Sequence, residues 1–467
     1  MIAVHTFPLA DENGITPVGL VAGGTSAALF AVLAGVSVAM LTGRQRVVPG
    51  TGSAARHGLR LAVRGLAVGT LGMALGQAEL GSIDIILTYY GVLFLLAVPL
   101  VLLSTRALFV VGALIVVIAP VISFVIRAQL PPTDLIDPSF TALVSDPGGL
   151  LTTLFLTGAY PVLPWLAYLC VGIGVGRCSL GQVRTAGRLV VSGAALVVAA
   201  AAVSHLALVG LGGLGHIKAN PGLPAEELRA ALTEGPDGVT PTTTWWWLAV
   251  DTAHSSTPLS MARTIGTSLL VLGALLLLDR GLDRARPTRA LRMAGAAQAP
   301  LAAAGAMTLT FYTLHVVFAG VAGELDPWVL YPIQVSFALL VGVLWQRLVG
   351  RGPLEAGVGT LVDAVVTSPS ATSAISARKR TATVIVALAL TVIGFGLAVA
   401  EVASGDSGSP TTSQQEESAE PDNTATDPDP DDQKVESDPP SRPGQLDEVD
   451  QPAAPDGQDE QEEADDD

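Results

Sequence analysis

The chain has 467 residues, of which half are hydrophobic and 14% are charged, and its mean hydropathy is +0.54. A soluble domain with this balance would expose more apolar surface than water tolerates, so the composition excludes an ordinary soluble protein and predicts a membrane protein. The formal net charge of −16 is concentrated at one end. Residues 401–467 hold 23 of the 41 acidic residues, and the first 400 residues carry a net charge of about +5 (23 basic against 18 acidic residues).

Ten stretches are apolar and long enough to cross a membrane core, which takes about 20 helical residues. They are residues 18–42, 58–77, 83–104, 107–126, 153–176, 187–210, 261–279, 299–321, 330–348 and 381–401. The sequence therefore predicts an all-α, polytopic bundle of about ten transmembrane helices. Pro161 and Pro164 interrupt the fifth stretch, where we expect one kinked helix rather than two short ones, because neighbouring helices can satisfy the carbonyl groups that proline frees.

Basic residues are distributed unequally between alternate loops. One set of loops and helix entries holds 19 Lys and Arg residues, and the opposite set holds only Arg127, Lys218, Arg229 and Arg263. Because cytoplasmic loops are enriched in Lys and Arg, the first set is predicted to be cytoplasmic. This orientation places both the N-terminus and the C-terminal tail outside the cell, in a multi-pass protein of the cell membrane. The Arg-, Ala- and Gly-rich composition is typical of a bacterial genome rich in G and C.

The segments between and after the spans are polar. Residues 128–149 and 211–260 form long outer loops, and loops of such length are usually functional or disordered. The run 245–247 consists of three tryptophans just before the seventh span, which favours an interfacial anchor over a ligand-stacking platform. Residues 402–467 are rich in Asp, Glu, Pro, Ser and Gln and cannot bury a core, so we expect a disordered, extracytoplasmic acidic tail.

Several common classes of site are not indicated. Cys170 and Cys178 lie eight residues apart on or near one apolar segment and do not suggest a disulfide framework. The sequence has no Gly-rich phosphate loop, no Cys/His cluster with metal-ligand spacing and no nucleic-acid-binding patch. We therefore expect no metal ion, no tightly bound cofactor and no nucleic-acid partner; the expected partner is the lipid bilayer.

The strongest candidate site residue is His315. Ionisable groups inside a membrane span are costly and are functional candidates by default. Thr308, Tyr312 and His315 follow the spacing i, i+4, i+7 and are predicted to share one face of the eighth span, directed into the bundle. Histidine exchanges protons near neutral pH and suits general-base catalysis. The alternative interpretation is that these side chains only form hydrogen bonds to neighbouring helices.

Further polar residues are predicted at the same depth, near the outer ends of the spans. His254 and Asp251 precede the seventh span, Asp84 and Tyr90 lie at the outer entry of the third, and His5 lies close to the membrane surface. Together with His315 they predict an outward-opening pocket, in which Asp251 or Asp84 orients an imidazole. For the two remaining outer histidines we favour a structural or interfacial role.

Several segments resemble one family of bacterial membrane proteins, the YeiB-like and heparan-α-glucosaminide N-acetyltransferase-like proteins. The segment SAALFAVLAGVSVAMLTGR (26–44) is similar to the second-helix signature of that family, and GAMTLTFYTLHVVF (305–318) is similar to a late helix. The segments HSSTPLSMARTIGTSLLVLGALLLL (254–278) and ILTYYGVLFLLAVPL (86–100) also fit, and the resemblance covers roughly residues 1–350. Residues 351–380 are then expected to be a cytoplasmic linker, residues 381–401 an additional span and residues 402–467 the tail.

The resemblance implies a membrane acyltransferase that takes an acyl group from acetyl-CoA or a similar co-substrate in the cytoplasm. The acceptor would be an amine or hydroxyl group of a sugar or another envelope molecule on the outer side. Under this interpretation His315, His254 and His5 are catalytic candidates. Arg60 and Arg64 lie one turn apart at a cytoplasmic helix entry and would bind donor phosphates, since guanidinium groups pair well with phosphate. Snorkelling of both arginines to lipid headgroups is the alternative.

The resemblance also leads to an expectation about the N-terminus. Met1–Val4 is a short apolar stub similar to the last turn of the family's first helix, so we expect the true start to lie upstream and the native protein to have eleven spans. Two other function classes remain open at this point. Intramembrane His and Arg residues also occur in transporters and permeases, and the acidic tail is compatible with a non-catalytic envelope protein.

Overall fold

A computed structural model describes residues 1–11, 14–78, 83–131, 136–236, 239–284, 298–321 and 326–366, all within one unit of the chain, Met1–Ser407. These residues are mainly helical, as predicted. Six helical segments are long and apolar enough to cross a membrane, and two bent helix pairs raise the number to eight. A shorter apolar helix, Leu87–Leu100, matches a ninth predicted span. The predicted span 381–401 and the acidic tail lie outside the described residues. The protein is thus a multi-pass membrane protein.

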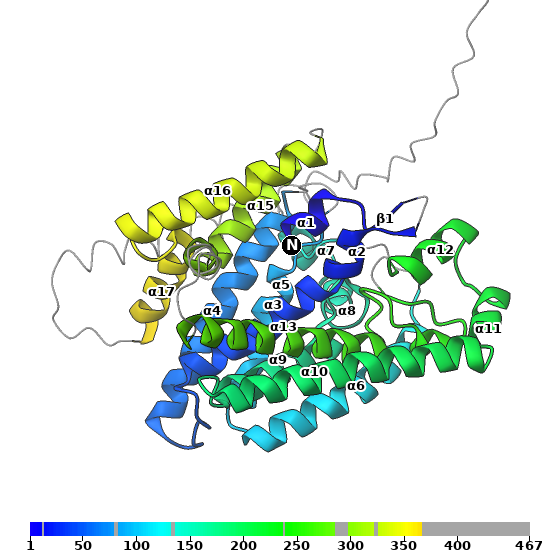
Figure 1. The fold of residues 1–467 in the computed structure, drawn as a ribbon, viewed down its shortest axis with the longest axis horizontal. Helices are drawn as coiled ribbons and strands as arrows, with labels where there is room; N and C mark the ends of the chain where they lie inside the picture. Colours follow the sequence, from blue (N-terminus) through cyan, green and yellow to red (C-terminus); the bar gives the residue numbers. More distant parts are fainter. Residues whose placement is uncertain are drawn as a thin grey trace, which may run out of the picture. The chain divides into compact units, whose positions relative to one another are not determined.

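The elements follow one another along the chain as Figure 1 labels them. The first half contains α1 (Ile2–Thr6), β1 (Ala10–Asp11), β2 (Gly14–Ile15), α2 (Pro17–Ala22), α3 (Thr25–Leu41), α4 (Gly52–Gly76), α5 (Leu87–Leu100), α6 (Thr105–Arg127), α7 (Phe140–Ser145), α8 (Pro147–Thr152), the π-helix η1 (Thr153–Thr157) and α9 (Val162–Arg177). The second half contains α10 (Val183–His205), the π-helix η2 (Leu206–Gly210), α11 (Gly213–Ala219), α12 (Ala225–Thr233), the 3₁₀-helix η3 (Trp245–Ala249), α13 (Pro258–Arg284), α15 (Thr308–Val321), α16 (Pro327–Leu348) and α17 (Pro353–Val366).

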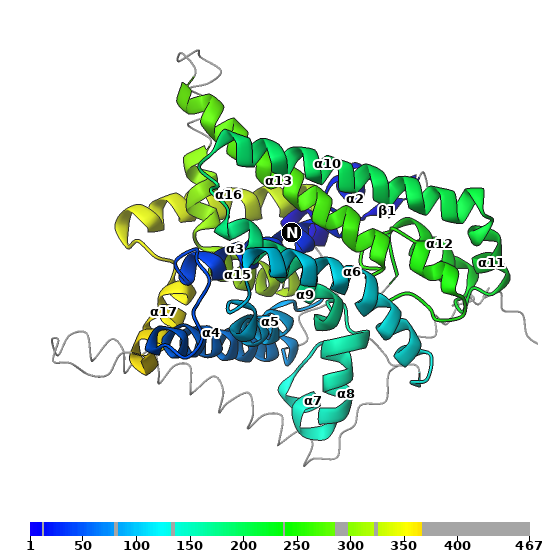
Figure 2. The ribbon, with the colours of Figure 1, turned by 90° about the horizontal axis from the view of Figure 1, so that it is seen from below.

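The long helices pack in pairs through small residues. The pairs α3–α9, α4–α5 and α10–α13 form extensive contacts, and α10 and α13 run side by side in both Figure 1 and Figure 2. The backbones of α3 and α9 meet at Gly35 and Gly172, where a Cβ atom on Gly172 would lie 2.1 Å from the carbonyl oxygen of Val32. Small residues allow such close approach of membrane helices, where packing rather than the hydrophobic effect drives association.

Two of the predicted spans are broken. The segment around Pro161 consists of Pro147–Thr157 and Val162–Arg177, which meet at 52°, so two helices replace the expected single kinked one. The eighth predicted span divides into Gln298–Gly305 and Thr308–Gly320, which meet at 82°. Proline and glycine explain the two breaks, since neither supports a continuous helix at these positions. The second break matters for the site, because α15 begins there.

The loop 211–260 folds into a small helical layer over one end of the bundle. Trp247 is fully buried and packs with Phe124, Ile217 and Val250 in a second hydrophobic core. Trp246 stacks on His216 at 5.7 Å, and only Trp245 is largely exposed. The prediction that all three tryptophans anchor the membrane interface was therefore wrong for Trp247, because an aromatic side chain that fills a loop core cannot also contact lipid headgroups.

Candidate functional site

Two histidines far apart in the sequence form a direct pair. The Nδ1 atom of His5 on α1 lies 2.8 Å from the Nε2 atom of His315 on α15, and their rings stack with centroids 5.0 Å apart. The pair forms because α1 packs against both α15 and α16. His315 is buried, as expected for a polar side chain directed into the bundle. The structure thus brings together two of the three predicted catalytic histidines.

Gln334 fixes the tautomers of this pair. The Nδ1 atom of His315 contacts the Oε1 atom of Gln334 on α16, and because a carbonyl oxygen only accepts, His315 Nδ1 must donate. His315 Nε2 is then an acceptor in the neutral ring, so His5 Nδ1 donates to it. The Nε2 atom of neutral His5 is left as a base. Sequence analysis missed Gln334, although a lone amide inside an apolar span is itself a functional signal.

The third predicted catalytic histidine, His254, lies in the loop before α13. It is within electrostatic range of His5, and its ring contacts that of Tyr160 at 5.8 Å. The backbone at His254 and Ser256 has positive φ values of 53° and 50°. Non-glycine residues seldom adopt this left-handed conformation, and such strain is concentrated at functional sites.

His254 lines a polar cavity that we call the loop pocket. This cavity of about 640 Å³ lies beneath α12 and the loops around it. Its charged or titratable lining residues are Asp84, Glu227, Glu234 and His254. Three carboxylate groups around one imidazole favour a ligand with a cationic or hydrogen-bond-donating group. Asp84 therefore lies where the sequence predicted it, whereas the two glutamates come from a loop whose fold could not be predicted.

The segment that carries Asp84 is held from two sides. The Ile85 N–H donates to Asp137 Oδ1 at 2.8 Å, and the Ile86 N–H donates to Tyr312 Oη at 3.2 Å. Burial raises the pKa of the Asp137 carboxyl group above its ordinary value, and the Ile85 N–H partly opposes this shift. Tyr312, one turn before His315, thereby links the histidine pair to the edge of the loop pocket.

Three predicted binding residues lie elsewhere. Tyr90 is buried, and its hydroxyl donates to the Ala27 carbonyl, so it joins α5 to α3. Asp251 forms an ion pair with Arg263 at 3.6 Å and lines a separate cavity. Thr308 is half-buried at the start of α15 and donates to the carbonyl of Gly305 at the helix break, although it shares one continuous helix with Tyr312 and His315 as the spacing predicted.

The first turn of α15 is capped by a carboxylate from α17. Glu355 Oε1 accepts from the backbone N–H groups of Leu309 and Thr310 at 2.7 and 3.1 Å, and its Oε2 accepts from the Thr310 hydroxyl at 2.6 Å. A carboxylate satisfies the unpaired N–H groups at a helix N-terminus and interacts favourably with the helix dipole. Glu355 therefore stabilises the break that lets α15 start within the bundle.

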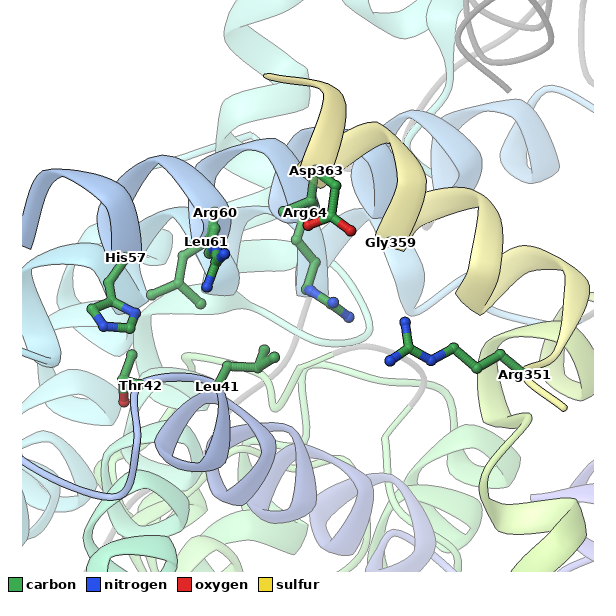
Figure 3. A pocket seen from close by; sticks show the side chains of 10 residues that line it. Leu41, Thr42, His57, Arg60, Leu61, Arg64, Arg351, Gly359 and Asp363 are labelled. Atoms are coloured by element: carbon green, nitrogen blue, oxygen red, sulfur yellow. The ribbon is translucent and has the colours of Figure 1, made fainter. Parts of the chain in front are cut away.

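A second cavity, here called the basic pocket, lies at the other end of α3. It has a volume of about 270 Å³ and is lined by Leu41, Thr42, His57, Arg60, Leu61, Arg64, Arg351, Gly359, Val362 and Asp363. Figure 3 shows Arg64 on α4 and Arg351 near α17 extending toward one another. Arginine side chains stay charged at neutral pH. Such a cluster is suited to binding phosphate groups.

Both predicted arginines, Arg60 and Arg64, therefore line the same cavity. Arg351 was not predicted, because it lies almost 300 residues from Arg64 in the sequence and only the packing of α17 against α4 brings it there. The helix α17 itself falls within the segment 351–380, for which the sequence indicated only a linker. Among the residues that the structure describes, no group of three or more His, Cys, Asp or Glu side chains could hold a metal ion.

The loop pocket and the basic pocket lie at opposite ends of α3. Gly24, just before α3, packs against Ala253 next to His254, whereas Leu41 and Thr42 at the other end line the basic pocket. The 17 residues of α3 span about 25 Å at 1.5 Å per residue. This distance approaches the thickness of the hydrocarbon core of a bilayer.

Residues 1–209 match a family model described as heparan-alpha-glucosaminide N-acetyltransferase, catalytic. This part of the chain is therefore similar to the catalytic region of that N-acetyltransferase family. The protein is therefore a membrane acetyltransferase-like protein. No curated protein and no solved structure matches the chain. The resemblance to YeiB-like proteins stays a prediction.

The family match covers only part of the candidate site. His5, Arg60, Arg64 and Asp84 lie within the matched residues of the N-acetyltransferase-like region. His254, His315, Gln334 and Arg351 lie beyond them and are connected to that region by the contacts described above. The geometry therefore extends the site past the matched residues, into α15, α16 and the start of α17.

Proposed function

We propose that the protein transfers an acyl group across the membrane, from a CoA thioester bound in the basic pocket to an acceptor bound in the loop pocket. The observation that supports this most is the arrangement of the two pockets at opposite ends of α3. The His5–His315 pair is connected to the edge of the loop pocket through Tyr312, which accepts from Ile86 two residues after Asp84. In this proposal the arginine-rich end faces the cytoplasm, as the distribution of basic residues favours. The loop pocket and the acidic tail are then on the outer side of the cell membrane.

The donor would bind through its phosphate groups. Arg60, Arg64 and Arg351 offer guanidinium groups in one cavity, and these groups pair with phosphate oxygens through parallel hydrogen bonds. The flexible arm of the donor would then extend along the bundle toward the histidine pair. Binding energy gained at the phosphates can hold the thioester in position for reaction, as remote contacts do in other transferases.

The acceptor would be an amine or hydroxyl group, for example of a sugar or another envelope molecule. The carboxylates of Asp84, Glu227 and Glu234 attract an amine to the loop pocket. The Nε2 atom of His5 accepts a proton as the acceptor attacks the thioester carbonyl carbon. The carbon–sulfur bond breaks, and the departing thiolate takes up a proton. His315 and Gln334 hold His5 in the tautomer that makes it a base.

The test is acyl transfer by the purified protein in sealed vesicles. Acetyl-CoA carrying a labelled acetyl group is supplied on one side and a glucosamine-type acceptor on the other, and labelled acceptor is measured. We expect transfer in the wild type and its loss in His315→Ala. The matched control is His205→Ala, because His205 is exposed and lines a different cavity. Thioester consumption that does not depend on His315 would contradict the proposed site.

Transport is the second candidate function, because broken helices with ends inside the bundle are common in carriers. The same vesicles distinguish the two functions. Movement of the acceptor compound across the membrane without consumption of the thioester would favour transport over acyl transfer.

A further inference from the structure

A narrow apolar cavity, which we call the lateral crevice, ends at the histidine pair. It has a volume of about 180 Å³ and lies between α15 and α16, with Ile2 of α1 at one side. Its apolar walls are Phe311, Leu314, Phe318, Ile333, Phe337 and Ala338. Among the described residues, its polar lining consists of His315 and Gln334. The crevice therefore connects an apolar space to His315, whose partner His5 accepts the proton in the proposed function.

The polar end of the crevice has an unsatisfied hydrogen-bond donor. Gln334 is only 6% exposed, and no described residue accepts a hydrogen bond from its Nε2 atom. Its Oε1 atom is already occupied by His315. Buried polar groups nearly always have a partner, so an unpaired N–H donor that lines a cavity points to an acceptor atom on a ligand.

The other end of the crevice opens toward the expected position of the lipid. Phe337 is 49% exposed and Ile333 is 47% exposed, although both lie on a helix long and apolar enough to span a membrane. Leu314 and Phe318 on α15 are exposed beside them. Exposed apolar side chains on a span are solvated by lipid. A hydrocarbon chain can therefore extend along the crevice without contacting water.

We propose that the lateral crevice seats the hydrocarbon tail of the transferred acyl group, with its carbonyl oxygen accepting a hydrogen bond from Gln334 Nε2. This inference rests on the proposed acyl transfer and deepens it: the preferred acyl group is longer than acetyl. An acetyl group would reach His315 but would leave the apolar walls without contacts. The source of the chain is either an acyl-CoA thioester or an acyl ester of a membrane lipid, and both present the same carbonyl and tail.

The chemistry is the same for both sources. The acceptor forms a bond to the carbonyl carbon and gives its proton to the histidine pair. The bond from that carbon to sulfur or to the ester oxygen breaks, and the leaving thiolate or alkoxide takes a proton in return. Negative charge collects on the carbonyl oxygen in the transition state, so the Gln334 N–H contributes most at that point.

The first experiment measures kcat/KM of the reconstituted protein for acetyl-, butyryl-, hexanoyl- and decanoyl-CoA. We expect kcat/KM to rise by up to about fourfold for each methylene group buried, until the crevice is full. Ala338→Phe should fill the crevice and return the preference to acetyl-CoA. The matched control is Leu340→Phe, which places the same phenylalanine side chain at an exposed position of the same helix outside the crevice. It should leave the chain-length profile unchanged.

A second variant tests the hydrogen bond. Gln334→Glu keeps an oxygen for His315 Nδ1 and removes the N–H donor. We expect kcat to fall at least tenfold for every chain length and at every pH, with little change in the KM of the acceptor. A loss that disappears at high pH would come from the charge of the new carboxylate, which favours a protonated imidazole, and would overturn the assignment. Equal activity of Gln334→Glu and the wild type would overturn the assignment of the carbonyl to Gln334.

Photo-crosslinking separates the inference from the proposed function and identifies the source. The wild-type protein in vesicles is exposed to an acyl-CoA or to a phospholipid, each with a photoreactive group at the chain end. If the probe labels peptides from α15 and α16 and Ala338→Phe abolishes this labelling, the result supports binding of the acyl chain in the lateral crevice. The probe that gives the labelling identifies the source of the acyl group. A preference for acetyl-CoA with no labelling there overturns the inference and leaves acyl transfer standing. No consumption of any acyl compound overturns the proposed function and the inference together.

Discussion

At the scale of single residues, the relay Gln334–His315–His5 explains how one imidazole becomes a directed base. Neutral histidine can place its proton on either ring nitrogen, and the choice is set by the partner of the other nitrogen. The Gln334 oxygen can only accept a hydrogen bond, so His315 donates to it through Nδ1. The Nε2 atom of His315 then accepts from His5 Nδ1, which leaves Nε2 of His5 as the base. A carboxylate at this position would have favoured a charged imidazole, whereas the amide favours the neutral form that proton abstraction requires.

Because the two histidines act as one unit, their variants should not be additive. We expect His5→Ala and His315→Ala each to lower kcat by about 10²–10⁴-fold, the usual contribution of a positioned general base. The double variant should be no slower than the slower single variant, as found for residues that act together. Measured kcat values of the three variants test this. His216→Ala is the control, because His216 stacks on Trp246 away from the pair. Multiplicative losses would show that the histidines act independently.

At the scale of elements, one close helix contact and one helix break position these residues. The contact of α3 with α9 holds the helix that connects the pockets, and the break before Thr308 lets α15 present His315 to α1. Glu355 stabilises the break, and Arg351 lies four residues before it. The start of α17 therefore connects the basic pocket to the helix that carries His315.

The α3–α9 contact gives a prediction for stability. Gly172→Val should lower the free energy of unfolding by about 1–3 kcal/mol or more, since its side chain would collide with the backbone of α3. The measurement is the melting temperature in detergent. Gly187→Val on α10 is the matched control, because a Cβ atom at Gly187 meets nothing within 4 Å. Equal melting temperatures of the two variants would contradict the importance of the contact.

The sequence predicted the spans well and the site only in part. Hydropathy depends on local composition, so the predicted spans within the described residues correspond to helices or bent pairs. The 82° bend before Thr308 was missed, since Gly305 alone does not predict it and the carboxylate that caps the N–H groups after the bend, Glu355, lies 45 or 46 residues away. Gln334 and Arg351 were missed for the same reason. Each becomes part of a site only through packing between helices, which sequence spacing does not reveal.

At the scale of the whole molecule, the protein presents a basic cavity at one end of α3 and an acidic cavity with histidine at the other. A donor with several phosphate groups and an acceptor with an amine would be drawn to opposite ends by charge alone. The distance of about 25 Å between them, from the length of α3, requires a long and flexible donor arm. The arrangement separates binding of the charged part of the donor from reaction at its far end.

This separation predicts how the arginine variants behave. Arg64→Ala and Arg351→Ala should each raise the KM for acyl-CoA about tenfold, since hydrogen bonds to charged groups contribute about 1.5–3 kcal/mol. The kcat at saturating donor should change little, because neither side chain lies near the histidine pair. Initial rates over a range of donor concentrations measure both constants. Arg56→Ala is the control on the same helix, since Arg56 is exposed and does not line the pocket. A fall in kcat with unchanged KM would place these arginines in the chemical step and argue against a donor site in the basic pocket.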